Sequence, residues 1–215
     1  MASNHLIVRT FEKRPYLHFL QAMQEFTLHR DDLTHDEVWL LEHQPVFTQG
    51  QNGKPEHILD LKETPLVKTD RGGQITYHGP GQIMVYTLID LKRKAISIRQ
   101  FVGTLEQIVI DFLADRKIKA SAKCDARGVY IVQNNIEKKI CSIGLRVKRG
   151  CTYHGLAFNV DMDLEPFSRI NPCGYSGLPM THLAEWGKTP HPIDIGKQLV
   201  RYFIKNLGYT DAEYF

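Results

Sequence analysis

Hydrophobic residues recur at helical spacing in three segments of this 215-residue chain. The clearest segment begins after Ser97, whose Ser-x-x-Gln pattern with Gln100 is typical of a capping box at the start of a helix. A second helix is predicted over residues 16–30. A third is predicted over residues 195–207, followed by Gly208, a residue favoured just beyond a helix end. One side of the helix over residues 16–30 carries Leu17, Leu20 and Gln24.

Shorter runs rich in β-branched and aromatic residues predict strands. These runs are residues 5–10, 37–43, 66–69, 82–91, 128–132, 140–147 and 152–160. The last three follow one another too closely to leave room for crossover helices, which parallel neighbours need. We therefore expect an α+β fold with a mixed, largely antiparallel sheet flanked by helices, rather than a doubly wound parallel sheet. No repeat or linker interrupts the pattern, so residues 1–215 are expected to form a single domain.

Composition is that of an ordinary globular protein, with 42% hydrophobic and 24% charged residues. A net charge of +3 is too small to predict a nucleic-acid partner. No apolar run approaches the roughly 20 residues that span a bilayer, and the first residues lack the pattern of a secretory signal. The four cysteines show neither CxxC spacing nor the density of a disulfide scaffold, which favours the cytoplasm. The histidines show no HxH or HxxxH spacing, so no metal site is expected.

Basic residues gather in two short stretches of the sequence. The first contains Lys138, Lys139, Arg146, Lys148 and Arg149, and the second contains Lys92, Arg93, Lys94 and Arg99. Such clusters form either solvated faces or a docking surface for an acidic partner, whose encounter they would accelerate. The sequence pattern leaves both interpretations open.

One cysteine stands in a predicted sharp turn, where Cys173 lies between Pro172 and Gly174. Pro172 has a fixed φ and Gly174 can adopt a positive φ, so the turn can present the thiol at a defined angle. A thiol is a good nucleophile only as thiolate, and a nearby ammonium stabilises that form. Lys139, upstream beside a small-residue strand, is a candidate for this partner. The alternative is a small buried cysteine in a tight turn.

Two further stretches suit a binding site. Residues 71–82 contain four glycines and a proline, so that a ligand can approach the backbone closely, and Tyr77 and His78 add an apolar wall and a polar handle. Residues 149–160 predict a strand whose segment 155–157 suits the floor of an apolar groove. An ordinary turn and a core strand explain the same patterns. Neither a Walker A loop nor a GxGxxG fingerprint is found.

Four segments together, RGGQITYHGPGQ, KKICSIGLRVKRG, CTYHGLAFNVDMDL and RINPCGY, resemble the lipoyl(octanoyl) transferases. The segment DEVWLLEHQPVFTQGQNGKPEHIL is similar to the N-terminal part of the same family, so the resemblance extends over nearly the whole chain. It implies the fold of the biotin and lipoate protein ligase catalytic domain, a mixed sheet backed by helices. It also implies transfer of an octanoyl group from octanoyl-acyl carrier protein to a lysine of a lipoyl domain, the first step of endogenous protein lipoylation.

The resemblance assigns roles to particular residues. Cys173 corresponds to the nucleophile that holds the octanoyl group as a thioester, and Lys139 corresponds to its proton-handling partner. The positions implied to bind substrate are Arg71, Gly72, Gly73, Gln74, Ile75, Thr76, Tyr77, His78, Ser142, Ile143, Gly144, Gly155, Leu156 and Ala157. No cofactor and no metal is implied.

The implied partners are octanoyl-acyl carrier protein as donor, and the lipoyl domains of 2-oxoacid dehydrogenase complexes and the glycine cleavage H protein as acceptors. These are small acidic proteins in the family, which fits a basic docking surface; neither nucleic acid nor membrane is expected. Two alternatives stay open. One is an ATP-dependent lipoate or biotin protein ligase on the same fold, and the other is a non-catalytic module that binds lipoyl domains or carrier proteins.

Overall fold

The computed structural model describes residues 4–215, so residues 1–3 of the predicted domain lie outside the described part of the chain. The strands are β1 (His5–Thr10), β2 (Asp36–Leu41), β3 (Val46–Gln49), β4 (Leu66–Lys68), β5 (Ile75–His78), β6 (Gln82–Leu88), β7 (Ala120–Ala122), β8 (Gly128–Gln133), β9 (Ile136–Lys148), β10 (Cys151–Asn159) and β11 (Asp211–Tyr214). The α-helices are α1 (Tyr16–His29), α2 (Ile98–Ala114) and α3 (Pro192–Leu207). Short 3-10 helices occupy Pro55–His57, Glu165–Arg169, Pro172–Gly174 and Leu183–Trp186.

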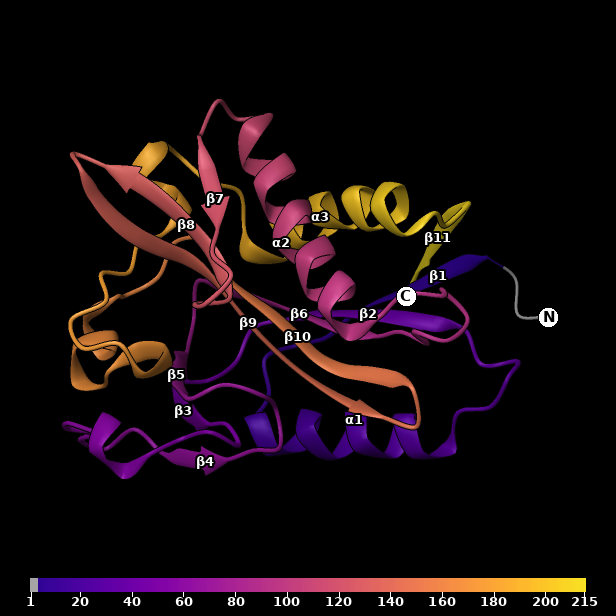
Figure 1. Cartoon of the computed structure of the whole chain (residues 1–215), viewed down its shortest axis with the longest axis horizontal. Coiled ribbons are helices and arrows are strands. Elements are labelled where there is room, and N and C mark those ends of the chain that lie inside the picture. Colours follow the sequence, from indigo (N-terminus) through magenta and orange to yellow (C-terminus); the bar gives the residue numbers. More distant parts are fainter. Residues whose placement is uncertain (1–3) are drawn as a thin grey trace.

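A large sheet runs through the molecule in the order β11-β1-β2-β6-β10-β9-β8-β7 (Figure 1). β1 is parallel to its two neighbours, β11 and β2, whereas the remaining pairs of this sheet are antiparallel. The consecutive strands β8, β9 and β10 pair as antiparallel neighbours, as their close spacing requires. The prediction of a mixed, largely antiparallel sheet flanked by helices is confirmed.

Helices cover both faces of this sheet. α2 and α3 lie together on one face, and α1 lies on the other, along the bottom of Figure 1. On the first face, Phe101, Phe112 and Phe203 are fully buried in the larger hydrophobic core. On the second face, Phe19 and Met23 of α1 pack in a smaller core against the sheet. The hydrophobic period of each helix therefore decides which side of it meets the sheet.

The predicted ends of the helices agree closely with the structure. The side of α1 that was predicted to carry Leu17 does not match the side that is buried. α2 begins with the expected capping box, in which Ser97 Oγ accepts a hydrogen bond from the backbone N–H of Gln100 at 3.3 Å. In α1, Leu17 is 51% exposed. The buried stripe instead runs through Tyr16, Phe19, Leu20, Met23 and Thr27. Leu17 lies one residue, about a quarter turn of a helix, away from the start of this stripe.

A second, three-stranded sheet has the order β4-β3-β5 and lies at the end of the molecule that carries the site. Only its β4 segment was predicted; β3 and β5, of four residues each, were not. β5 is the middle of the glycine-rich stretch 71–82. The Pro172–Gly174 turn lies against β5, so the small sheet fixes the cysteine turn in place.

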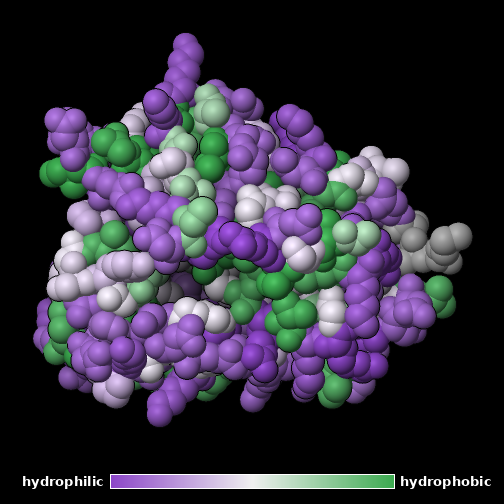
Figure 2. Space-filling view, viewed as in Figure 1, coloured by the Kyte–Doolittle hydropathy of each residue, from purple (hydrophilic) through white to green (hydrophobic). Residues whose placement is uncertain are grey.

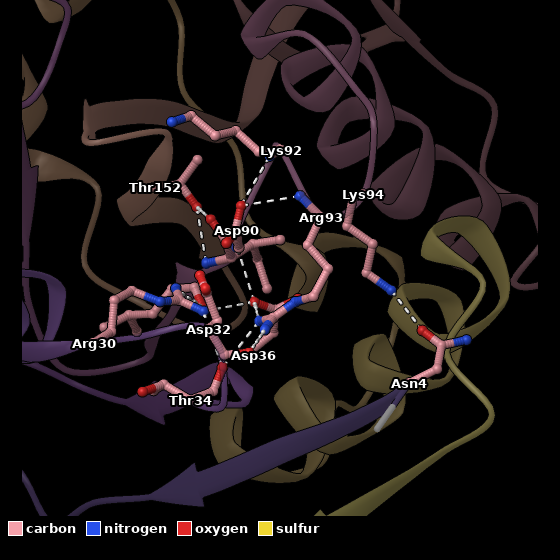
Figure 3. A network of polar contacts seen from close by, with 12 residues as sticks. Asn4, Arg30, Asp32, Thr34, Asp36, Asp90, Lys92, Arg93, Lys94 and Thr152 are labelled. Carbon is pink, nitrogen blue, oxygen red and sulfur yellow. Dashed lines mark hydrogen bonds and ion pairs between the residues drawn. The ribbon is translucent and has the colours of Figure 1, made fainter. Parts of the chain in front are cut away.

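A buried carboxylate, Asp36 of β2, lies in a network of polar contacts with Arg30 and Arg93, as Figure 3 shows. Asp36 is 2% exposed and accepts hydrogen bonds from Arg30 Nη2 at 2.9 Å, Arg93 Nη2 at 2.6 Å and Tyr209 OH at 2.8 Å. Two guanidinium groups compensate the cost of burying this charge. Beside the network, Lys94 Nζ donates to the carbonyl oxygen of Leu207 at 3.1 Å. Arg93 and Lys94, counted above in the second basic stretch, therefore hold the fold together.

Candidate active site

A cavity of about 530 Å³ lies between the glycine-rich stretch 71–76, the neighbouring strands β9 and β10, and the Cys173 turn. Figure 2, which has the same view as Figure 1, shows a recess near the middle of the visible face, with hydrophobic residues gathered beside it. Its apolar lining is formed by Ile75, Met84, Ile98, Val102, Ile143, Leu145, Leu156 and Ala157. A largely apolar cavity with a few polar groups at one side suits a ligand that has a hydrocarbon chain and a reactive polar end.

The turn at Cys173 holds the residue in a strained conformation. Cys173 has φ +58° and ψ +15°, in the left-handed region that few residues other than glycine adopt, and Gly174 follows with φ +84°. The Gly174 N–H donates to Asn171 O at 3.0 Å and the Tyr175 N–H donates to Pro172 O at 3.1 Å, which closes the turn. Strain of this kind persists only where the surroundings fix it, and it occurs preferentially at functional sites. The thiol faces the cavity.

Lys139 lies directly beside this thiol. Its Nζ is 3.1 Å from Cys173 Sγ and donates a second hydrogen bond to Arg127 O at 2.8 Å, and the residue is fully buried. Burial on its own lowers the pKa of Lys139, but the facing Cys173 thiolate and Tyr130 outweigh it, so the pKa lies above its ordinary value. An ammonium this close to a sulfur is a group that can stabilise a thiolate, the nucleophilic form of cysteine.

The structure brings most of the predicted substrate-binding residues together around this pair. Those that line the cavity are Arg71, Gly72, Gly73, Gln74, Ile75, Thr76, His78, Ser142, Ile143, Gly144, Gly155, Leu156 and Ala157. Tyr77 is placed elsewhere: its ring packs against Phe47 and Phe167, with centroids 5.3 and 5.6 Å away. Successive side chains of a strand point to opposite faces, so Tyr77 on β5 faces away from Thr76 and His78.

Arg71 places a second cation near the thiol. Its guanidinium donates to Gly72 O at 2.9 Å, Thr48 O at 2.6 Å and Thr48 Oγ1 at 2.8 Å, all uncharged oxygens. Within residues 4–215 its buried Nε has no hydrogen-bond partner. Burial lowers the pKa of Arg71, while Tyr16 and Cys173 among its neighbours oppose this change. Arginine nevertheless stays protonated in proteins, so Arg71 supplies a fixed positive charge at the cavity wall.

His154, at the inner wall of the cavity, belongs to a buried polar network. Its Nε2 and Asp70 Oδ1 are 2.9 Å apart, and Gln24 and Tyr153 donate hydrogen bonds to Asp70 Oδ2. Burial alone raises the pKa of Asp70, but the hydrogen bonds from His154, Tyr153 and Gln24 lower it well below its usual range. Burial lowers the pKa of His154, which favours the neutral imidazole. His154 also has φ +61° within β10, a second strained residue at the site.

The glycines around the cavity serve different purposes. A Cβ on Gly144 would lie 3.1 Å from Arg71 Cδ, so a side chain there would displace the arginine. A Cβ on Gly155 would lie 2.0 Å from Val85 O, so Gly155 permits the close approach of β10 and β6. Gly73 has φ +85°, a conformation that side chains disfavour irrespective of space. Of these three glycines, Gly144 is the one where a methyl group meets neither a positive φ nor a contact below 3.0 Å; its nearest backbone neighbour would be Gly72 O at 3.2 Å.

Several residues at the site could not be found from sequence reasoning. The cavity is also lined by Tyr16, Asn52, Met84, Tyr86, Ile98, Val102, Asp125, Ala126, Arg127, Leu145, His154 and Tyr175. Most of these belong to the apolar patterns of helices and strands, which do not distinguish a cavity wall from a core. Glu106 does not line the cavity but contacts Arg127, which does; it carried a signal in the sequence, because it is a charged residue within the buried face of α2, where it is 3% exposed.

The two basic stretches of the sequence converge at the turn between β9 and β10. The Lys92 side chain lies against Gly150, where a Cβ would approach its Cε to 2.7 Å, and Lys148 and Arg149 are exposed at the same turn. Lys138 pairs with Glu185 at 3.0 Å, so its charge is partly compensated within the chain. The basic surface is therefore smaller than the sequence suggested, and we define it as Lys92, Lys148 and Arg149.

Residues 4–215 contain no group of three or more His, Cys, Asp or Glu side chains arranged to hold a metal ion. Within the same residues, the helices are too short or too polar to cross a membrane.

Known proteins share both the sequence and the fold of this chain. A family model described as the lipoyl protein ligase A/B catalytic domain matches residues 15–204. An octanoyltransferase of Escherichia coli O139:H28 (strain E24377A / ETEC) is 50% identical over 214 residues, which cover 100% of this chain and 99% of that protein. An octanoyltransferase of Vibrio vulnificus (strain YJ016) is 50% identical over 211 residues, covering 98% and 95%. The chain belongs to the octanoyltransferase family.

The chain also resembles ligases of known structure. A bipartite lipoate protein ligase, described with its E2 lipoyl domain from Thermoplasma acidophilum, superimposes with a TM-score of 0.74 at 16% identity, covering 100% of this chain and 86% of that chain. At this identity the similarity concerns the fold alone. The predicted resemblance to the lipoate ligase fold is confirmed, and the 50% identical relatives confirm the predicted acyltransferase activity.

Proposed function

We propose that residues 1–215 form a single catalytic domain that transfers an octanoyl group through a thioester on Cys173. The donor is octanoyl-acyl carrier protein, and the acceptor is the ε-amine of a specific lysine on a lipoyl domain. One observation carries the proposal: the Lys139 ammonium lies 3.1 Å from the thiol of a strained cysteine, at the wall of an apolar cavity. This arrangement combines an activated nucleophile with space for an acyl chain.

In the first half of the reaction, the Cys173 thiolate attacks the carbonyl carbon of the donor thioester. The new carbon–sulfur bond forms as the bond to the carrier sulfur breaks, and Lys139 gives a proton to the departing carrier thiolate. One thioester replaces another, so the step is nearly even in energy and needs no ATP. The buried Arg71 guanidinium adds a fixed positive charge near the reacting atoms, which favours the negative charge that develops there.

In the second half, the acceptor lysine attacks the Cys173 thioester and forms an amide. A free lysine amine is mostly protonated near neutral pH, so this step needs a base. Once Cys173 is acylated, Lys139 no longer faces a thiolate, the main cause that raises its pKa, whereas the burial that lowers its pKa remains. The neutral amine of Lys139 is then the group placed to take the proton. Departure of the Cys173 thiolate restores the ion pair for the next cycle.

The proposed partners are supported by the basic surface and by one structural relative. The basic surface of Lys92, Lys148 and Arg149 would attract acidic carrier proteins and lipoyl domains by complementary charge. The bipartite ligase with a similar fold is described with its E2 lipoyl domain, which supports an acceptor of this class. Lipoyl domains of 2-oxoacid dehydrogenase complexes and the glycine cleavage H protein are the expected acceptors. We propose the cytoplasm as the compartment, because Cys173 must stay reduced to act.

Two competing functions predict different results. An ATP-dependent ligase would not need a nucleophile beside Lys139, and a binding module would show no turnover. The test incubates the protein with octanoyl-acyl carrier protein and a lipoyl domain, with and without ATP, and follows the mass of the lipoyl domain. We expect octanoylation without ATP that Cys173→Ala abolishes and Cys124→Ala, a change at an exposed cysteine, leaves intact. Strict dependence on ATP, or no transfer under either condition, would contradict the proposal.

A further inference from the structure

A buried glutamate of α2 reaches the site through one peptide group. Glu106 lies among the apolar residues of the buried face of α2 and is 3% exposed. Its Oε1 accepts a hydrogen bond from the backbone N–H of Gly128 at 3.0 Å, and its Oε2 lies 3.3 Å from Arg127 Nη1. A buried carboxylate is costly unless it has such partners.

The same peptide group contacts Lys139 from its other side. The carbonyl oxygen of Arg127 belongs to the peptide whose N–H comes from Gly128, and it accepts a hydrogen bond from Lys139 Nζ at 2.8 Å. Lys139 Nζ in turn lies 3.1 Å from Cys173 Sγ. The contacts therefore form one continuous chain from the Glu106 carboxylate through the peptide and the ammonium to the thiol.

The peptide has little freedom of its own near the lysine. Gly128 has φ +132°, and a Cβ there would lie 2.6 Å from Lys139 Cε and 2.4 Å from Cys141 O. Without a side chain at this position, the lysine end packs directly on the backbone. Gly128 pairs with Ser142 of β9, so the sheet holds this segment on one side. The Glu106 carboxylate is the group that binds the peptide from the core side.

We infer that Glu106 is a positioning residue that fixes the Arg127–Gly128 peptide and thereby holds the Lys139 ammonium against the Cys173 thiol. The inference rests on the proposed function, because it gives Lys139 and Cys173 their catalytic roles. Glu106 touches neither reacting atom. Its effect is one of geometry, and a misplacement of a catalytic group by about 1 Å can cost on the order of 10²-fold in rate.

The test compares two substitutions of Glu106 that separate the length of its side chain from its negative charge. Glu106→Gln keeps a carbonyl oxygen at the distance of the Gly128 N–H but loses the charge, whereas Glu106→Asp keeps the charge but loses the reach. Glu42 offers a matched control, since it is a buried glutamate, 8% exposed, whose Oε2 accepts a hydrogen bond from the Gly81 N–H at 2.6 Å. Glu42→Asp therefore shortens a buried glutamate by the same one methylene group, at a position away from Lys139 and Cys173.

Each variant is measured for thermal unfolding, for single-turnover formation of the octanoyl-enzyme, and for the pH profile of Cys173 alkylation by iodoacetamide. We expect Glu106→Asp to slow octanoyl-enzyme formation by about 10-fold or more and to move the alkylation profile towards higher pH. Glu106→Gln should stay within about threefold of the parent rate, because hydrogen-bond reach is what the position supplies. Glu42→Asp should leave rate and profile unchanged, even where it lowers the unfolding temperature.

A parent-like alkylation profile in Glu106→Asp, or an equal shift in Glu42→Asp, would overturn the positioning role. A loss in Glu106→Gln as large as that in Glu106→Asp would overturn the geometric explanation in favour of charge. Failure of the proposed function is recognised separately: the parent protein itself would then form no octanoyl adduct on Cys173. The alkylation profiles remain interpretable in that case, because they need no acyl donor.

Discussion

Lys139→Arg is the substitution that tests the proton transfer most sharply, because it keeps the positive charge. Lys139 is fully buried, and its Nζ lies 2.8 Å from Arg127 O and 3.1 Å from Cys173 Sγ. Arginine can still pair with a thiolate, but its pKa is above about 12, so it cannot release a proton at neutral pH. The first half of the reaction should therefore suffer less than the second, in which the side chain must act as a base.

The expected size of the effect follows from the site. Loss of general base catalysis typically costs 10²- to 10⁴-fold, or about 3 to 5 kcal/mol in the transition state. The guanidinium is also larger than the ammonium it replaces, and Gly128 borders the lysine end closely, since a Cβ there would lie 2.6 Å from Lys139 Cε. Overpacking of this kind costs about 1–3 kcal/mol of stability. Turnover at saturating substrate should therefore fall at least 10²-fold, with a smaller decrease in the free energy of unfolding.

The assay separates the two half-reactions by rapid quench and intact mass. Octanoyl-enzyme formation is followed with donor alone, and octanoyl transfer is followed after addition of a lipoyl domain to the isolated octanoyl-enzyme. Lys138→Arg is the matched control, because the Lys138 ammonium is 3.0 Å from Glu185 Oε2 rather than beside the thiol. Near-normal transfer by Lys139→Arg, or equal losses in Lys138→Arg, would refute the proton-transfer role.

Three further predictions concern docking, the cavity and pH. Charge reversal by Lys148→Glu and Arg149→Glu should weaken the use of octanoyl-acyl carrier protein far more than that of a small octanoyl thioester, and added salt should reproduce part of this loss; equal effects on both donors would make the basic surface structural. Gly144→Ala should raise the KM for donor while the protein stays folded, whereas Gly155→Ala should lower the unfolding temperature, because its Cβ would meet Val85 O at 2.0 Å; unchanged values would contradict both assignments. Burial lowers the pKa of His43 from 6.5 to about 4, so the unfolded chain binds the proton first as pH falls. Between about pH 6.5 and 4, the parent should therefore lose up to about 3 kcal/mol of unfolding free energy that His43→Gln retains. Urea-denaturation profiles of the two proteins that change in parallel with pH would refute this.

The sequence predicted the fold where local signals were strong. The capping box at Ser97 and the close spacing of β8, β9 and β10 are local features, and the structure agrees with both. The short strands β3 and β5 were not predicted; β5 lies within residues 71–82, whose four glycines and proline indicated a bending segment rather than a strand. Leu17 was misplaced because the buried stripe of α1 is set by Phe19 and Met23, which meet a sheet built from distant parts of the chain.

The sequence indicated candidate residues for the site but not how they are arranged. The order Pro–Cys–Gly indicated a sharp turn, and Gly174 does adopt a positive φ, but the positive φ of Cys173 itself follows from packing against β5. The partner of His154 is Asp70, which lies far away in the sequence and meets it only in the folded chain. The contact between Glu106 and Gly128 likewise joins α2 to β8. Such contacts have no local pattern in the sequence.

The central claim is that Cys173 carries the octanoyl group as a thioester during transfer. The most direct test is the intact mass of the protein after incubation with octanoyl-acyl carrier protein alone, followed by peptide mapping and treatment with hydroxylamine, which cleaves thioesters. The account predicts one octanoyl adduct, located on Cys173 and removed by hydroxylamine. An adduct on Cys124, Cys141 or Cys151, or a protein that transfers the octanoyl group without ever forming an adduct, would contradict it.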